Sequence, residues 1–130
     1  DAMAESGGGS IVNIGSIQGM VAPDDTLYEG TGMSGFYPDY FFHKGGMINF
    51  TRFTAAYYGP KEIRCNCICA GGVFNDQDPR FVERYSDRTF LGRMAGDYDR
   101  TGIVVFLASD DSRYLTGANI PVNGGMFMSF

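Results

Sequence analysis

The apolar residues of this chain follow two kinds of spacing, which alternate along the sequence. Compact apolar runs at residues 10–15 and 63–69 are typical of buried strands. Three longer segments have apolar residues at helical spacing, and they are residues 40–58, 78–86 and 97–109. A brief third strand is expected within residues 116–125. The order strand, helix, strand, helices, strand predicts a right-handed parallel α/β unit.

Glycine, proline and aspartate mark the connections between these elements. Residues 1–6 carry helix formers and lead into three glycines, so we expect them to end a helix that begins before residue 1. Residues 17–39 form a long connection, and loops of this length tend to be functional lids or disordered segments. Its acidic side chains either bind polar groups of a ligand or, more simply, are solvated; they are Asp24, Asp25 and Glu29.

The predicted helix over residues 40–58 has two apolar faces. One face carries Tyr40, Lys44, Met47, Ile48 and Thr51, and the other carries Phe42, Phe50, Phe53 and Tyr57. Burial on both sides is expected, against the sheet and against another subunit. Gly45 and Gly46 each cost up to about 1 kcal/mol relative to alanine in a helix. We therefore expect a cofactor or a neighbouring backbone to approach closely there.

The shorter predicted helices each have one buried stripe. In residues 78–86 it comprises Phe81, Val82 and Tyr85, and in residues 97–109 it comprises Ile103, Val104, Phe106 and Leu107.

Composition limits the classes of protein to which the chain can belong. Its 130 residues suffice for one domain with a real core. Fifteen acidic residues against ten basic ones, without a basic cluster, argue against nucleic acid and membranes as partners. No apolar run approaches the roughly 18 residues of a membrane span. Because the first residues do not resemble a signal peptide, we expect a soluble, cytoplasmic protein.

Three cysteines, Cys65, Cys67 and Cys69, alternate along one predicted strand and would project from the same face. A disulfide fits this spacing poorly, and no set of further ligands is evident, so we expect no metal site. Buried, reduced thiols that act as small apolar side chains are the favoured interpretation.

Candidate chemistry lies at the start of the longest helix. Tyr40 and Lys44 are four residues apart, so the phenol and the ammonium share one face. The fixed positive charge favours the phenolate, which suits general acid–base catalysis. Taken alone, such a pair is more often a packed tyrosine beside a solvated lysine. Ser16 follows the first strand, and ligands bind at the carboxyl ends of parallel strands.

Five spaced motifs then follow one another along nearly the whole chain. They are Gly15-Ser16 after a strand, Tyr40-x-x-x-Lys44 opening a helix, Arg64-x-Asn66 leading into Gly71-Gly72-Val73, Phe106-Leu107-Ala108-Ser109-Asp110, and Thr116-Gly117 followed by Val122-Asn123-Gly124-Gly125. In this order they resemble the carboxyl-terminal half of a short-chain dehydrogenase/reductase. The run Gly72-Val73-Phe74-Asn75 and the long connection before Tyr40 also resemble the family's branch in surface-glycan and nucleotide-sugar biosynthesis.

The resemblance implies a fold. It is an α/β architecture, a three-layer Rossmann-like parallel sheet with helices on both faces. This chain would carry the last three strands of that sheet in one domain over residues 1–130.

The resemblance also implies a function, an NAD(P)-dependent oxidoreductase that interconverts a hydroxyl and a carbonyl on a small, for example sugar-like, substrate. Ser16 would bind the substrate oxygen, and Tyr40 would transfer its proton. Lys44 would hold the nicotinamide ribose, and Gly71, Gly72 and Val73 would meet the nicotinamide amide. Apart from the resemblance, the exposed aromatic face expected on the helix at residues 40–58 suggests a homodimer or homotetramer.

One family feature has no counterpart in the sequence. No glycine-rich turn between a strand and a helix is available to seat a pyrophosphate, and no residue chooses between NAD and NADP. Three interpretations follow. In the favoured one, the chain is the carboxyl-terminal part of a dehydrogenase whose other half is cleaved or supplied as a separate chain. The second is a truncated, non-catalytic relative that acts as a dimerisation or interaction module. The third is a small α/β protein with hydrolytic or binding chemistry that needs no nicotinamide.

Overall fold

Three parallel strands form the centre of the protein, in the order β1-β2-β3. The computed structural model describes residues 2–126. Strand β1 spans Gly9–Ser16, β2 spans Ile63–Ala70 and β3 spans Asn119–Val122. The register pairs Gly9 with Ile63 at one end of β1 and Ser16 with Ala70 at the other. Among the described residues, β1 pairs with β2 and β2 pairs with β3.

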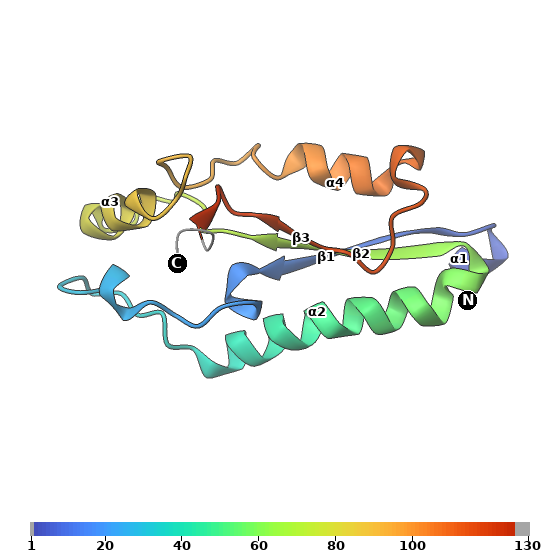
Figure 1. Cartoon of the computed structure of the whole chain (residues 1–130), viewed down its shortest axis with the longest axis horizontal. Coiled ribbons are helices and arrows are strands. Elements are labelled where there is room, and N and C mark those ends of the chain that lie inside the picture. Colours follow the sequence, from blue (N-terminus) through green and yellow to red (C-terminus); the bar gives the residue numbers. More distant parts are fainter. Residues whose placement is uncertain (1, 127–130) are drawn as a thin grey trace.

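Helices cover both faces of this sheet (Figure 1). The long helix α2, Pro38–Tyr58, lies along one face, and α4, Thr101–Ala108, lies along the other. Helix α3, Pro79–Asp87, lies beyond the carboxyl ends of the strands, and the short α1, Ala2–Glu5, lies at the opposite end. The predicted three-layer α/β architecture is confirmed.

Helix α2 packs one face on the sheet, where Thr51, Thr54 and Ala55 are buried. The opposite face, with Phe42, Phe50, Phe53 and Tyr57, is between 59% and 77% exposed in the single chain, so its burial against another subunit stays a prediction. A neighbouring backbone does approach the helix near Gly45. A Cβ added to Gly19 would lie 2.6 Å from the carbonyl oxygen of Lys44. At Gly45 itself an added Cβ would lie 3.7 Å from the carbonyl oxygen of Gly19, an ordinary contact, and at Gly46 it would meet nothing within 4 Å.

The prediction for α4 is wrong at its start and in one buried residue. The helix begins at Thr101 rather than Asp97, because the Asp99 carboxylate folds back to accept from the Gly96 amide at 2.7 Å. Leu107 is fully buried and Ile103 and Val104 are half-buried, but Phe106 is 40% exposed. Adjacent helical residues point about 100° apart. A short helix that turns Leu107 to the sheet therefore turns Phe106 away from it.

The connection between β1 and α2 is ordered by contacts with α3. It contains two 3₁₀ turns, Ile17–Gly19 and Asp25–Leu27. Arg88 pairs with Asp24 at 2.8 Å, and Arg84 donates to the carbonyl of Glu29. The carboxylate of Asp24 thus serves the structure of the connection.

The cysteines of β2 are buried free thiols, as predicted. Hydrogen bonding between neighbouring thiols lowers the pKa of Cys67 to about 7 and raises that of Cys69. Within residues 2–126, no group of three or more histidine, cysteine or acidic residues is placed to hold a metal ion. No helix in that range is long and apolar enough to cross a membrane.

Candidate active site

A cavity of about 350 Å³ opens at the carboxyl ends of β1 and β2. Its size lies at the lower end of the range of about 300–1,000 Å³ that is usual for ligand sites. Parallel strands bring their carboxyl ends to one edge, so residues distant in sequence meet there. The predicted site residues all line this cavity; they are Ser16, Tyr40, Lys44, Gly71, Gly72 and Val73.

Lys44 and Tyr40 share the first turns of α2. The helix starts at Pro38, whose fixed φ suits the first helical position, with Asp39 in the first turn. The Lys44 ammonium donates to the carbonyl of Ile14 at 2.7 Å and lies 5.5 Å from the centroid of the Tyr40 ring. The hydrogen bond to β1 holds the lysine in place, while Tyr40 lines the cavity and its hydroxyl makes no hydrogen bond among the described residues.

Ser16 is the last residue of β1 and caps the following 3₁₀ turn. Its hydroxyl oxygen accepts from the Gln18 amide at 3.1 Å, which is the usual role of a serine at this position. The hydroxyl proton remains available to an acceptor in the cavity. Ser16 is therefore held by the chain in a position from which it can donate a hydrogen bond to a ligand oxygen.

The loop after β2 forms another wall of the cavity and is fixed from behind. The Gly71 amide donates to Val122 of β3 at 2.9 Å, and Ala95 donates to the carbonyl of Gly72 at 3.0 Å. The buried Tyr85 hydroxyl accepts from the Gly72 amide. A Cβ at Gly72 would lie 2.8 Å from the Tyr85 ring, so this position requires glycine.

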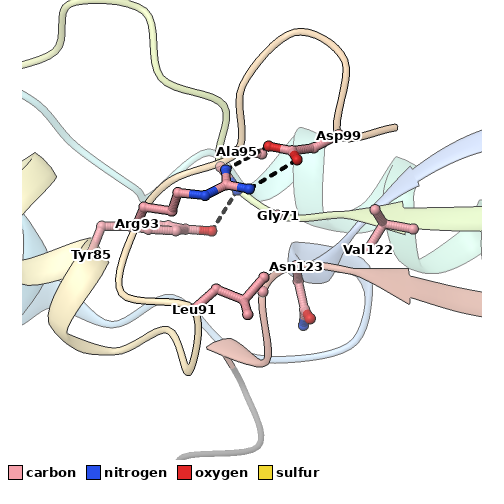
Figure 2. A pocket seen from close by; sticks show the side chains of 10 residues that line it. Gly71, Tyr85, Leu91, Arg93, Ala95, Asp99, Val122 and Asn123 are labelled. Atoms are coloured by element: carbon pink, nitrogen blue, oxygen red, sulfur yellow. Dashed lines mark hydrogen bonds and ion pairs between the residues drawn. The ribbon is translucent and has the colours of Figure 1, made fainter. Parts of the chain in front are cut away.

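A second, smaller cavity of about 120 Å³ is lined by the same loop (Figure 2). Figure 2 shows the Arg93 guanidinium paired through two hydrogen bonds with Asp99, at 2.6 and 3.0 Å. The hydrogen bonds from Arg93 hold the pKa of the Asp99 carboxyl below its ordinary value. This pair ties residues 93–99 together beside Gly71 and Gly72, and it supports the loop from outside the larger cavity.

Several lining residues were not predicted as site residues. Gln18 and Tyr28 come from the long connection, Phe81 and Tyr85 from α3, and Arg100 directly precedes α4. The apolar spacing of α3 predicts that Phe81 and Tyr85 face inward, but spacing does not say that they face a cavity. The connection that contains Gln18 and Tyr28 has no periodic pattern, and Arg100 has no neighbouring motif. The sequence therefore contains no signal that would identify these three residues as part of a site.

A profile of the family described as enoyl-(acyl carrier protein) reductase matches residues 1–127 of the chain. The chain belongs to the short-chain dehydrogenase/reductase family. Among the family's curated members, a 7alpha-hydroxysteroid dehydrogenase of Bacteroides fragilis is 35% identical over 130 residues. That match covers 95% of this chain and 46% of the relative. A (3R)-3-hydroxyacyl-CoA dehydrogenase of Rattus norvegicus is 36% identical, over 98% of this chain and 47% of the relative.

Solved structures of family members have the same fold. A short chain dehydrogenase from Leptospira borgpetersenii with bound NAD+ superposes with a TM-score of 0.85 and 39% identity. The superposition covers 96% of this chain and 47% of the Leptospira chain. The short-chain dehydrogenase/reductase chain described here thus spans about half the length of the relatives it matches.

Proposed function

We propose that the protein provides the acid–base part of an NAD(P)-dependent oxidoreductase site that interconverts a hydroxyl and a carbonyl on a small molecule. The observation that carries the proposal is the meeting of Ser16, Tyr40 and Lys44 on one cavity, opposite the Gly71–Val73 loop. In the resemblance noted above, the same residue types act on substrate and cofactor together.

Each residue has a role that its contacts support. Ser16 donates its free hydroxyl proton to the substrate oxygen, and Tyr40 gives a proton to that oxygen or removes one from it. Lys44, held by the carbonyl of Ile14, places a positive charge 5.5 Å from the centroid of the Tyr40 ring.

A nicotinamide cofactor fits the residues that are present. The Lys44 ammonium has further donors for ribose hydroxyls, and the loop after β2 lines the same cavity. Among solved relatives, one is described with bound NAD+ and a gluconate 5-dehydrogenase from Burkholderia cenocepacia with NADP. When bound, the nicotinamide supplies or accepts the hydride. Both cofactors remain candidates for this protein.

Calorimetric titration with NAD+ and NADP+ tests the proposal. We expect the intact gene product to bind one of them, and Lys44→Met to weaken that binding about tenfold or more through loss of charged hydrogen bonds. Lys61→Met is the matched control, because Lys61 lies in the turn after α2 and outside the cavity. Absence of binding at millimolar cofactor, or equal affinity for Lys44→Met and the wild type, would contradict the proposal.

The exposed aromatic face of α2 favours a homodimer or homotetramer as the assembled form. Phe50, Phe53 and Tyr57 stack in a row, with ring centroids 6.2 and 6.0 Å apart. Contiguous apolar patches of this kind mark interfaces between proteins. The same face would serve the alternative function, a non-catalytic interaction module.

Light scattering after size-exclusion chromatography tests this surface. We expect Phe53→Asp to weaken self-association about tenfold or more, because a carboxylate would be buried in an apolar contact. Val105→Asp, at an exposed position of α4, is the control and should leave the mass unchanged. A wild-type monomer at all concentrations would rule the interface out.

A further inference from the structure

The cavity that holds Tyr40 and Lys44 contains a second cation. Arg100 directly precedes α4, and its side chain lines the same cavity. Helices α2 and α4 lie on opposite faces of the sheet (Figure 1). The cavity therefore reaches from the lysine on one face of the sheet around the carboxyl end of β1 to the arginine beside the other face.

The positive charge of Arg100 acts on the neighbouring Asp99 carboxylate without direct contact and helps to lower the pKa of that carboxyl. Within residues 2–126, its guanidinium makes no ion pair and no hydrogen bond. The adjacent carboxylate, Asp99, is already occupied by Arg93 and by the Gly96 amide. In the part of the chain that the structure describes, no aspartate or glutamate lines the cavity. A cavity with two cations and no carboxylate is unexpected in a chain whose net charge is −5.

The two cations differ in position and in the geometry of their hydrogen-bond donors, so we expect them to contact different parts of a ligand. The Lys44 ammonium is held by Ile14 beside Tyr40, at the reacting end of the cavity. Arg100 comes from another layer of the fold and has all five of its donors available. A guanidinium presents its donors as a planar fork that matches the two oxygens of a phosphate or a carboxylate. A half-buried arginine without a partner is stabilised when such an oxygen pair binds.

We propose that Arg100 binds an anionic oxygen pair of the ligand, a phosphate or a carboxylate, in the cavity that Tyr40 and Lys44 also line. Arg100 is then a specificity-determining residue that selects anionic ligands. The inference rests on the proposed function, since it takes this cavity as the ligand site. The phosphate would belong to the dinucleotide and the carboxylate to the substrate.

The test compares the wild type, Arg100→Gln, Arg100→Lys and the control Arg113→Gln by calorimetry. Arg113 is exposed in a distant turn, so the control removes the same charge without touching the cavity. The probes are NAD+, nicotinamide riboside, which lacks phosphate, and inorganic pyrophosphate. A second arm uses D-gluconate and uncharged sorbitol with saturating NAD+. Thermal unfolding of each variant checks that it is folded.

For a phosphate contact, Arg100→Gln should weaken binding of NAD+ and pyrophosphate about tenfold or more and leave that of nicotinamide riboside unchanged. For a carboxylate contact, the loss should instead appear with gluconate and be absent with sorbitol. Arg100→Lys should recover part of either loss, and Arg113→Gln should match the wild type.

Other outcomes separate this inference from the proposed function. If the wild type binds NAD+ and Arg100→Gln binds every probe equally well, the role of Arg100 is refuted and the proposed function stands. If pyrophosphate binding depends on Arg100 but neither NAD+ nor NADP+ binds, the anion site stands and the proposed function falls. If no probe binds the folded wild type, both are overturned.

Discussion

Replacement of Tyr40 by phenylalanine is expected to lower kcat of the intact gene product by about 10²–10⁴-fold, the usual contribution of a positioned acid or base. The change removes one hydroxyl at the cavity wall and keeps the ring that lies beside Lys44. Cofactor affinity should remain close to that of the wild type, because the contact of Lys44 with Ile14 does not involve the hydroxyl.

Initial rates followed by NAD(P)H absorbance, together with cofactor titration, measure both quantities. Tyr114→Phe is the matched control, because Tyr114 is fully exposed and lies outside the cavity. Its kcat should equal that of the wild type. A Tyr40→Phe enzyme with nearly full kcat would remove Tyr40 from the role of proton donor. A parallel loss of cofactor binding would instead point to damage of the cavity.

The largest effect on stability is expected at Arg64, where a single side chain joins β2 to the end of α4. Its guanidinium donates to the carbonyls of Leu107 and Ser109 at 3.0 and 2.9 Å, and to the hydroxyl of Ser112 at 2.8 Å. Cations are favourable at the carboxyl end of a helix, where carbonyl groups lack partners. These hydrogen bonds hold the carboxyl end of α4 against the sheet.

Arg64→Met keeps much of the side-chain length and removes all three hydrogen bonds. We expect the free energy of unfolding to fall by about 3 kcal/mol, the value of one or two charged hydrogen bonds after solvation of the freed acceptors. Urea unfolding followed by circular dichroism measures the change. Arg113→Met, whose exposed side chain makes a single contact within its own turn, should change stability by less than about 0.5 kcal/mol.

If Arg64→Met lowers the free energy of unfolding by less than about 1 kcal/mol, water must bind the freed acceptors about as favourably as the guanidinium does. The network would then contribute little to the docking of α4, which would be held mainly by Leu107.

The hydrogen bonds of Asn66 show what the Arg64-x-Asn66 motif does in the structure. The buried amide of Asn66 donates to the carbonyl of Leu115 at 2.8 Å and accepts from the Ala118 amide at 3.1 Å. Residues two apart on β2 point to the same face. Arg64 therefore binds the end of α4, and Asn66 binds the turn before β3, on that face of the sheet. The sequence shows the spacing, and the tertiary contacts show its purpose.

The main helices and strands could be predicted from the sequence, because the signals that define each of them lie within or next to its own residues. Apolar runs defined β1 and β2, and Gly59-Pro60 ended α2 close to its observed limit at Tyr58. The pairing of Tyr40 with Lys44 follows from helical geometry alone, since residues four apart share a face. The order of these elements then sufficed for a parallel α/β fold with its ligand edge at the carboxyl ends of the strands.

Contacts between distant segments decided the rest. The exposure of Phe106 depends on how a short helix meets the sheet, which the apolar spacing of residues 97–109 does not show. The meeting of Arg100 with Lys44 at one cavity joins residues from different layers of the fold. No spacing along the chain encodes such a meeting, because it arises only when the strands pair and bring both helices to the same edge.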